Sequence, residues 1–211
     1  MVRLILGALI STFLSSVMAD AKSIRDIDFK NLAYPFDETF HGVPGTWHWI
    51  TRLPQSKITL TQGRKDFLPP GAKEPRGPYD SYPYLMFGSV TYGDLNNDGL
   101  EEAAVDLAYG TGGTANWHYL YIFTLEHGVP KLLALLESGS RADGGLIRTS
   151  IEAGLLVLDF LDQGKRQGDC CSRGYIRVHY RWKRDHFIEQ GSRSYGALEI
   201  EERPIKEWWE D

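Results

Sequence analysis

Cysteine is scarce in this chain, and its placement excludes several classes of protein. The 211 residues contain only Cys170 and Cys171, which are neighbours. Two adjacent cysteines cannot build the multi-bridge framework of a disulfide-rich domain, and no nearby residues complete a zinc site around them. Three interpretations stay open: a strained vicinal disulfide that locks a turn, two free thiols, or pairing between molecules. We favour the vicinal Cys170–Cys171 bridge, as a structural clip.

Long apolar runs are also missing, apart from one at the N-terminus. Residues 4–17 form an apolar run that follows Arg3 and ends near Ala19 and Ala21. The run is shorter than a bilayer-spanning helix, and small residues two positions apart are typical of a signal-peptide cleavage site. We therefore expect residues 1–19 to be a secretory signal peptide and the mature protein to be periplasmic or extracellular, without a membrane span. The alternative is an N-terminal membrane anchor.

Positive charge is not in excess, and familiar catalytic motifs are absent. The chain has 23 Lys and Arg against 28 Asp and Glu, a formal net charge of −5. This mild acidity argues against nucleic acid and anionic membrane surfaces as partners. The sequence lacks the G-x-S-x-G, H-E-x-x-H and S-x-x-K patterns of common hydrolases. Whether the protein is an enzyme therefore stays open at this stage.

What the chain does have is strand periodicity. In residues 174–183, Ile176 and Val178 alternate with Arg177 and His179. One apolar face at period two predicts a half-buried antiparallel strand. Eight such segments predict an all-β fold of antiparallel meanders, arranged as two packed four-stranded sheets or propeller-like blades. The expected strands are 88–92, 101–109, 117–125, 130–138, 146–152, 155–161, 174–183 and 186–190.

Composition divides the mature chain into three parts. Residues 20–85 are rich in Gly, Pro and Trp, and predict an extended N-terminal arm with a short hairpin. Residues 86–195 form the antiparallel β core. Residues 196–211 are an acidic tail with a Trp208-Trp209 pair, which we expect to dock on the body or meet a partner.

The most informative motif lies between two of the expected strands. Residues 94–102 read D-x-N-x-D-G-x-x-E, with oxygen side chains at alternate positions and a glycine that allows a sharp turn. Calcium takes six to eight oxygen ligands, so this spacing predicts a calcium loop. The alternative is an Asn-Asp-Gly hairpin turn that needs no metal. The predicted ligands are Asp94, Asn96, Asp98, the backbone carbonyl of Leu100, and Glu102.

The loop resembles a single calcium-binding unit of FG-GAP repeats, the integrin-type β-propeller. Phe87 and Gly88 precede it and residues 103–107 follow it, as in such a unit. The motif occurs once, so the chain is not a propeller of that type. More widely, residues 92–103, residues 141–145 and the cysteine pair resemble a group of exported bacterial β-proteins without an assigned function. That wider resemblance brings no mechanism with it. The donor set of the loop, three carboxylates and one amide, suits a weak structural calcium site of about 10⁻⁴–10⁻³ M.

Two other features bear on function. His118 could face Asp143 or Glu102 across a sheet, which is the pairing that general-base chemistry requires. Aromatic residues of the expected loops could stack on sugars, although packing in the core is the alternative. These aromatic residues are Trp47, Trp49, Tyr79, Tyr82 and Tyr84.

We therefore expect an exported calcium-binding β-domain with a binding or structural role, whose partner is a protein or glycan of the cell envelope. The alternative is an envelope hydrolase that acts on glycan or peptide.

Overall fold

The computed structural model describes residues 22–37, 47–72, 82–113, 115–167 and 171–198. Within them the chain forms strands and three short 3-10 turns, so the predicted all-β class is confirmed. No helix in these ranges is long and apolar enough to cross a bilayer. The signal-peptide prediction, Cys170 and nearly all of the predicted tail lie outside the described residues. The vicinal bridge therefore stays a prediction.

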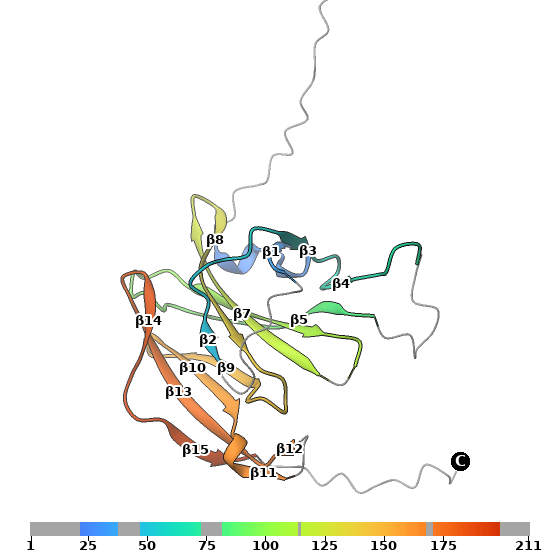
Figure 1. The fold of residues 1–211 in the computed structure, drawn as a ribbon. Coiled ribbons are helices and arrows are strands. Elements are labelled where there is room, and N and C mark those ends of the chain that lie inside the picture. Colours follow the sequence, from blue (N-terminus) through green and yellow to red (C-terminus); the bar gives the residue numbers. More distant parts are fainter. Residues whose placement is uncertain (1–21, 38–46, 73–81, 114, 168–170, 199–211) are drawn as a thin grey trace, which may run out of the picture.

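The larger sheet has six strands in the order β2-β8-β7-β6-β5-β4. Its centre is an antiparallel meander, in which strands adjacent in the chain are adjacent in the sheet (Figure 1). The β7–β8 turn is tight because His127 and Gly128 both take positive φ, at 52° and 76°, as two-residue hairpins require. The strands are β2 (His48–Trp49), β4 (Arg64–Asp66), β5 (Tyr84–Gly93), β6 (Glu102–Gly110), β7 (Asn116–Glu126) and β8 (Val129–Ser138).

The second sheet contains the other four predicted strands and one more. Its order is β14-β13-β10-β9, and β15 also pairs with β13. The two predicted four-stranded units are thus present, each widened by short strands at its edges. The members are β9 (Leu146–Glu152), β10 (Leu155–Leu161), β13 (Gly174–Lys183), β14 (His186–Glu189) and β15 (Ser194–Ala197). Two further two-stranded ladders join β1 (Ala33–Pro35) to β3 (Lys57–Thr59), and β11 (Arg166–Gln167) to β12 (Cys171–Ser172).

The six-stranded sheet is buried on both faces. One face meets the second sheet, and the core between them includes Leu120, Leu136, Leu158 and Phe160. The other face is covered by the N-terminal part of the chain. That second core contains Phe29, Tyr34, Phe36 and Leu60 together with Tyr119 and Tyr121 of β7. The arm is therefore a structural layer of the domain, which explains why β6 and β7 read as nearly continuous apolar runs.

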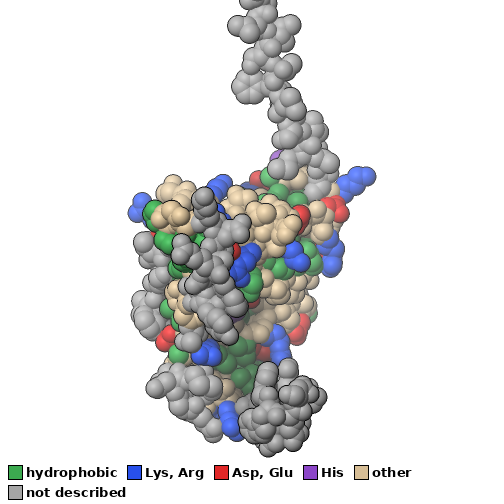
Figure 2. All heavy atoms as spheres, turned by 90° about the vertical axis from the view of Figure 1, so that its right-hand side faces the viewer, with side chains coloured by type: hydrophobic (Ala, Val, Ile, Leu, Met, Phe, Trp, Pro, Cys, Tyr) green, Lys and Arg blue, Asp and Glu red, His purple; other side chains and the backbone are tan. Residues whose placement is uncertain are grey.

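One face of the molecule carries side chains of both charges. On the face shown in Figure 2, Lys and Arg side chains lie among Asp and Glu side chains without a large patch of either charge.

The two sheets meet closely where β5 runs beside β9. The hydroxyl of Thr91 donates a hydrogen bond to the carbonyl oxygen of Thr149, at 3.3 Å. Gly93 lies against Ile151, and a Cβ at Gly93 would come within 2.4 Å of the Ile151 Cγ2. The absence of a side chain at residue 93 therefore lets the second sheet approach the base of the acidic loop.

Substituting Gly93 with alanine tests this junction. We expect Gly93→Ala to lower the free energy of unfolding by about 1–3 kcal/mol, because the new methyl group overpacks the contact with Ile151. The double variant Gly93→Ala/Ile151→Ala should lose less than the sum of its single variants. Gly113→Ala is the control, since a Cβ there meets nothing closer than 3.8 Å. Denaturant unfolding measures all four, and additive losses would contradict the contact.

Candidate functional site

The acidic loop joins β5 to β6 and is closed by its own first carboxylate. Asp94 Oδ1 accepts a hydrogen bond from the backbone N–H of Asn97 at 2.7 Å, and Asp94 Oδ2 accepts one from Gly99 at 3.0 Å. Gly99 takes a φ of +86°, in the region that favours glycine. Asp94 thus stabilises the turn by accepting hydrogen bonds from two backbone N–H groups.

The amide of Asn96 lies between two carboxylates. Its Nδ2 donates to Asp98 Oδ2 at 2.9 Å and to Glu102 Oε1 at 3.0 Å. Its Oδ1 accepts from the backbone N–H of Asp98 at 2.8 Å. The Asn96 amide therefore links Asp98 and Glu102, two of the residues that would hold a cation.

Glu102 is the buried member of the loop, with a relative exposure of 0%. Its Oε2 accepts from the backbone N–H of Leu95 at 2.8 Å, and its Oε1 accepts from the Thr124 hydroxyl at 3.1 Å. Burial raises the pKa of Glu102, and these hydrogen bonds lower it only in part. In the described part of the chain, the ion pairs do not include Glu102. The loop thus places a desolvated carboxylate beneath two more exposed ones, without a basic side chain to balance it.

Leu100 and Glu101 are the remaining positions at the end of the loop. Leu100 is 60% exposed, and its backbone N–H donates to Asp98 Oδ1 at 2.8 Å. Glu101 forms a two-pronged ion pair with Arg25, with an Nη2–Oε1 distance of 2.8 Å. Arg25 holds the pKa of Glu101 below its usual value. Glu101 is therefore bound to the N-terminal arm, not turned toward the loop centre.

The fit of a calcium ion depends on Asn96. Within the described residues, no three His, Cys, Asp or Glu side chains gather closely enough to hold a metal. The donor set is still the hard oxygen set that calcium prefers. To bind the ion, Asn96 would have to turn its amide oxygen toward Asp98 and Glu102. Rotation of one side chain would thus exchange an internal hydrogen-bond donor for a cation.

His118 pairs with neither of its two predicted partners. Its Nδ1 lies 3.0 Å from Oδ1 of Asp106, which is on the neighbouring strand and the same sheet face. The Glu102 carboxylate accepts a hydrogen bond from the Asn96 amide, and the Asp143 carboxylate accepts one from the Ser140 hydroxyl. Burial alone lowers the pKa of His118, but the hydrogen bond and charge of Asp106 outweigh it and raise the pKa overall.

A nucleophile beside this pair would favour the hydrolase. Ser138 is opposite His118 in the β7–β8 register. Its hydroxyl donates to the Gly139 carbonyl at 3.5 Å and accepts from the Leu146 N–H at 3.0 Å. The serine is thus engaged by backbone groups. Among the described residues, no hydroxyl or thiol group is hydrogen-bonded to the His118–Asp106 pair.

The tryptophans expected in loops pack on the second sheet instead. Trp47 stacks on Phe160 with ring centroids 4.0 Å apart, and Trp49 of β2 stacks on Phe187 at 4.6 Å. Tyr84 begins β5 beneath the guanidinium of Arg64. Tyr82 is half-buried, and Tyr79 lies outside the described residues. These contacts favour the packing alternative for both tryptophans.

Sequence reasoning missed two contributors to the site. Thr124 of β7 donates a hydrogen bond to Glu102, and Asp106 lies diagonally from His118. Asp106 could have been recognised from the sequence, because it lies in a mostly apolar strand segment and a buried carboxylate requires a hydrogen-bond or ionic partner.

Comparison with known proteins adds no further constraint. No family model, no curated protein and no solved structure matches this chain. The acidic loop is therefore the feature of this chain that bears most directly on its function.

Proposed function

We propose that this chain is an exported calcium-binding β-domain with a binding or structural role in the cell envelope. The observation that supports it best is the fully buried Glu102 carboxylate, which faces Asp98 across a single amide group. Burying a carboxylate without a cationic partner is unfavourable, and the raised pKa of Glu102 expresses that penalty. A divalent cation at this position would remove the penalty.

The binding would stabilise the junction of the two sheets. The loop begins after Gly93, which touches Ile151, and a Cβ at Gly154 would meet Asn97 Oδ1 at 2.9 Å. An ion held by the loop therefore braces the β5–β6 connection against the β9–β10 turn. This is the placement expected of a structural site.

Thermal unfolding in calcium and in EGTA tests the site. For an affinity of about 10⁻⁴–10⁻³ M, 10 mM calcium should stabilise the fold by about 1.4–2.7 kcal/mol. The midpoint should rise by about 3–11 °C. Asp94→Ala and Asp98→Ala should abolish the rise. Glu101→Gln is the matched control and should retain it, because Glu101 binds Arg25. An unchanged midpoint in the native protein would make the loop a metal-free turn.

Export is tested separately by the mass of the mature protein. When the full chain is expressed in a bacterial host with its own leader, the periplasmic product should lack residues 1–19 and begin at Asp20. Recovery of the uncleaved chain from the membrane fraction would instead indicate an N-terminal anchor.

A further inference from the structure

The outer face of the second sheet, which points away from the six-stranded sheet, carries a row of three charged residues. Leu158 and Val178 lie in the core between the two sheets, so their neighbours along β10 and β13 lie on the outer face. On that face Asp159 of β10 pairs with Arg148 of β9 on one side and with Arg177 of β13 on the other. We refer to these three residues as the central row.

Asp159 is buried and holds two guanidinium groups. Its side chain is only 2% exposed. Arg177 donates two hydrogen bonds to it, from Nε to Oδ1 at 2.7 Å and from Nη2 to Oδ2 at 2.9 Å. Nη1 of Arg148 lies 3.5 Å from the same Oδ2. Because both guanidinium groups approach one carboxylate oxygen, they lie close to each other.

Both arginines keep N–H donors that Asp159 does not use. Arg177 engages its Nε and Nη2, which leaves Nη1, and its side chain is 29% exposed. Within the described residues, the Arg148 guanidinium forms this ion pair but no hydrogen bond, and its side chain is 61% exposed. A guanidinium group carries five donors in a planar fork. The central row therefore presents unused donors from two sides of one buried carboxylate.

The central row also differs from the other arginine ion pairs in its balance of charge. Among the described residues, three further arginines each bind one carboxylate, in the pairs Arg25–Glu101, Arg64–Asp66 and Arg193–Glu189. Asp159 is instead shared by Arg148 and Arg177. One guanidinium charge of the central row thus has no carboxylate of its own within the row.

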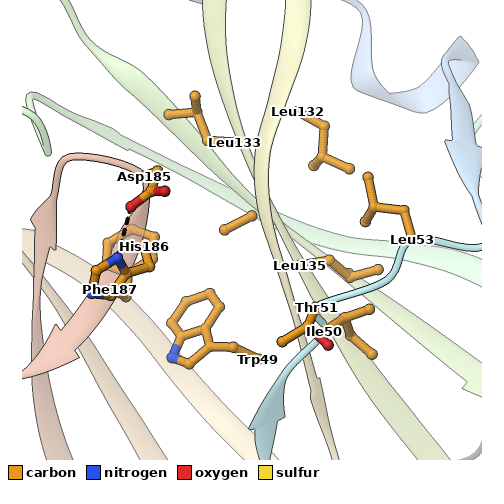
Figure 3. A pocket seen from close by; sticks show the side chains of 11 residues that line it. Trp49, Ile50, Thr51, Leu53, Leu132, Leu133, Leu135, Asp185, His186 and Phe187 are labelled. Carbon is orange, nitrogen blue, oxygen red and sulfur yellow. Dashed lines mark hydrogen bonds and ion pairs between the residues drawn. The ribbon is translucent and has the colours of Figure 1, made fainter.

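The other charged side chains of this face are of both signs. Glu152 of β9 lies on the same face as Arg181 of β13. At the end of β13, Lys183 pairs with His186 of β14, and His186 Nδ1 lies 2.8 Å from Oδ1 of Asp185 (Figure 3). Among the described residues of this face, the unmatched positive charge therefore belongs to the central row.

We propose that Arg148 and Arg177 bind a phosphate group over the outer side of Asp159. The guanidinium fork matches the oxygens of a phosphate, and two forks that converge favour an anion with more than one charge. Asp159 holds both side chains near each other before the anion arrives, which lowers the ordering cost of binding. Inorganic phosphate and a phosphate ester on a glycan both present the required oxygens.

Arginine side-chain NMR tests the site directly. Inorganic phosphate is titrated at constant ionic strength in EGTA, and the Nε–H signals of Arg148, Arg177 and Arg64 are followed. The first two signals should shift saturably with a Kd of about 1–10 mM, a weak affinity because Asp159 offsets part of the positive charge. The signal of Arg64 should not move, since its single carboxylate partner is Asp66. The use of EGTA separates this result from the outcome of the calcium experiment.

A second titration with glucose 1-phosphate distinguishes the two sources of the phosphate group. Equal or tighter binding of the sugar phosphate would assign the site to a phosphate ester. Binding of inorganic phosphate alone would assign it to the free anion. Both results would support the site at Arg148 and Arg177.

Two substitutions of Arg148 test its role without leaving Asp159 unpaired. Arg148→Gln should weaken phosphate binding at least about tenfold, because it removes one of the two forks. Arg148→Lys keeps the charge but not the fork and should bind with intermediate affinity. Arg64→Gln is the matched control and should bind like the native protein, since Arg64 is also exposed but belongs to a one-to-one pair. Melting temperatures confirm that each variant folds.

Three results would overturn the proposal. The Nε–H signals of Arg148 and Arg177 could fail to shift with either phosphate compound. Arg148→Gln could bind phosphate as tightly as the native protein. Sodium chloride at the same ionic strength could produce the same shifts, which would make the central row an ordinary solvated surface.

Discussion

Replacing Phe160 with alanine should lower the free energy of unfolding by about 3–5 kcal/mol. Phe160 has a relative exposure of 0%, lies in the core between the two sheets, and carries Trp47 on its ring face. The substitution removes buried apolar area and leaves a cavity that close-packed strands cannot fill. Urea unfolding measures the loss. Ile147→Ala in the adjacent sheet strand is the control and should change little, since Ile147 is 41% exposed.

The Phe160 position also tests the stacking contact between Phe160 and Trp47. In a double-mutant cycle of Phe160→Ala with Trp47→Ala, the coupling should be about 0.5–1.5 kcal/mol, as found for stacked aromatic pairs. Independent effects would show that Trp47 is free to face a ligand. That result would revive the interpretation of this tryptophan as a sugar platform.

Replacing Glu102 with glutamine should change stability in opposite directions with and without calcium. The pKa of Glu102 is raised above the usual value of 4.5, chiefly by burial. Its contribution to stability is therefore fully present below about pH 4.5 and is lost as the pH rises through the higher folded-state pKa. Glutamine imitates the protonated form. In EGTA at pH 7 the variant should be more stable than the native protein, and the difference should vanish near pH 4.

In 10 mM calcium the order should reverse. The native protein gains about 1.4–2.7 kcal/mol from the bound ion, whereas Glu102→Gln lacks the carboxylate that completes the donor set. Thermal unfolding of both proteins at pH 7 and pH 4, in calcium and in EGTA, measures the four differences. A variant that is less stable than the native protein in EGTA at pH 7 would mean that Glu102 acts only as a hydrogen-bond acceptor.

The strands could be predicted to different degrees along the chain. β13 matches its predicted bounds of 174–183, because one apolar and one polar face give a clear period of two. β5 extends from Tyr84 to Gly93 and is longer than the predicted 88–92, since its register shifts around Gly88 and the alternation is broken there. β2 was not predicted, because two residues carry no periodic signal.

The contacts of the candidate site could also be predicted only in part from the sequence. The turn of the acidic loop depends on contacts between residues up to five positions apart, such as Asp94 with Gly99, so its shape follows from local spacing. The partner of His118 depends on the register of β6 against β7, which places Asp106 on the same face. The ion pair between Arg25 and Glu101 joins residues 76 positions apart. Spacing along the chain cannot reveal a contact of that kind.

The amino-acid sequence by itself determined the all-β class, eight strands in two groups of four, and a turn built from oxygen-bearing side chains, because alternation and turn chemistry act over a few residues. Only the tertiary structure decided that the arm covers one sheet, that Trp47 and Trp49 pack on the second, and that Glu102 is buried under Asn96. These features depend on sheet register and on contacts between residues far apart in the chain. Such contacts form only when the two sheets and the arm pack together and bury the two cores.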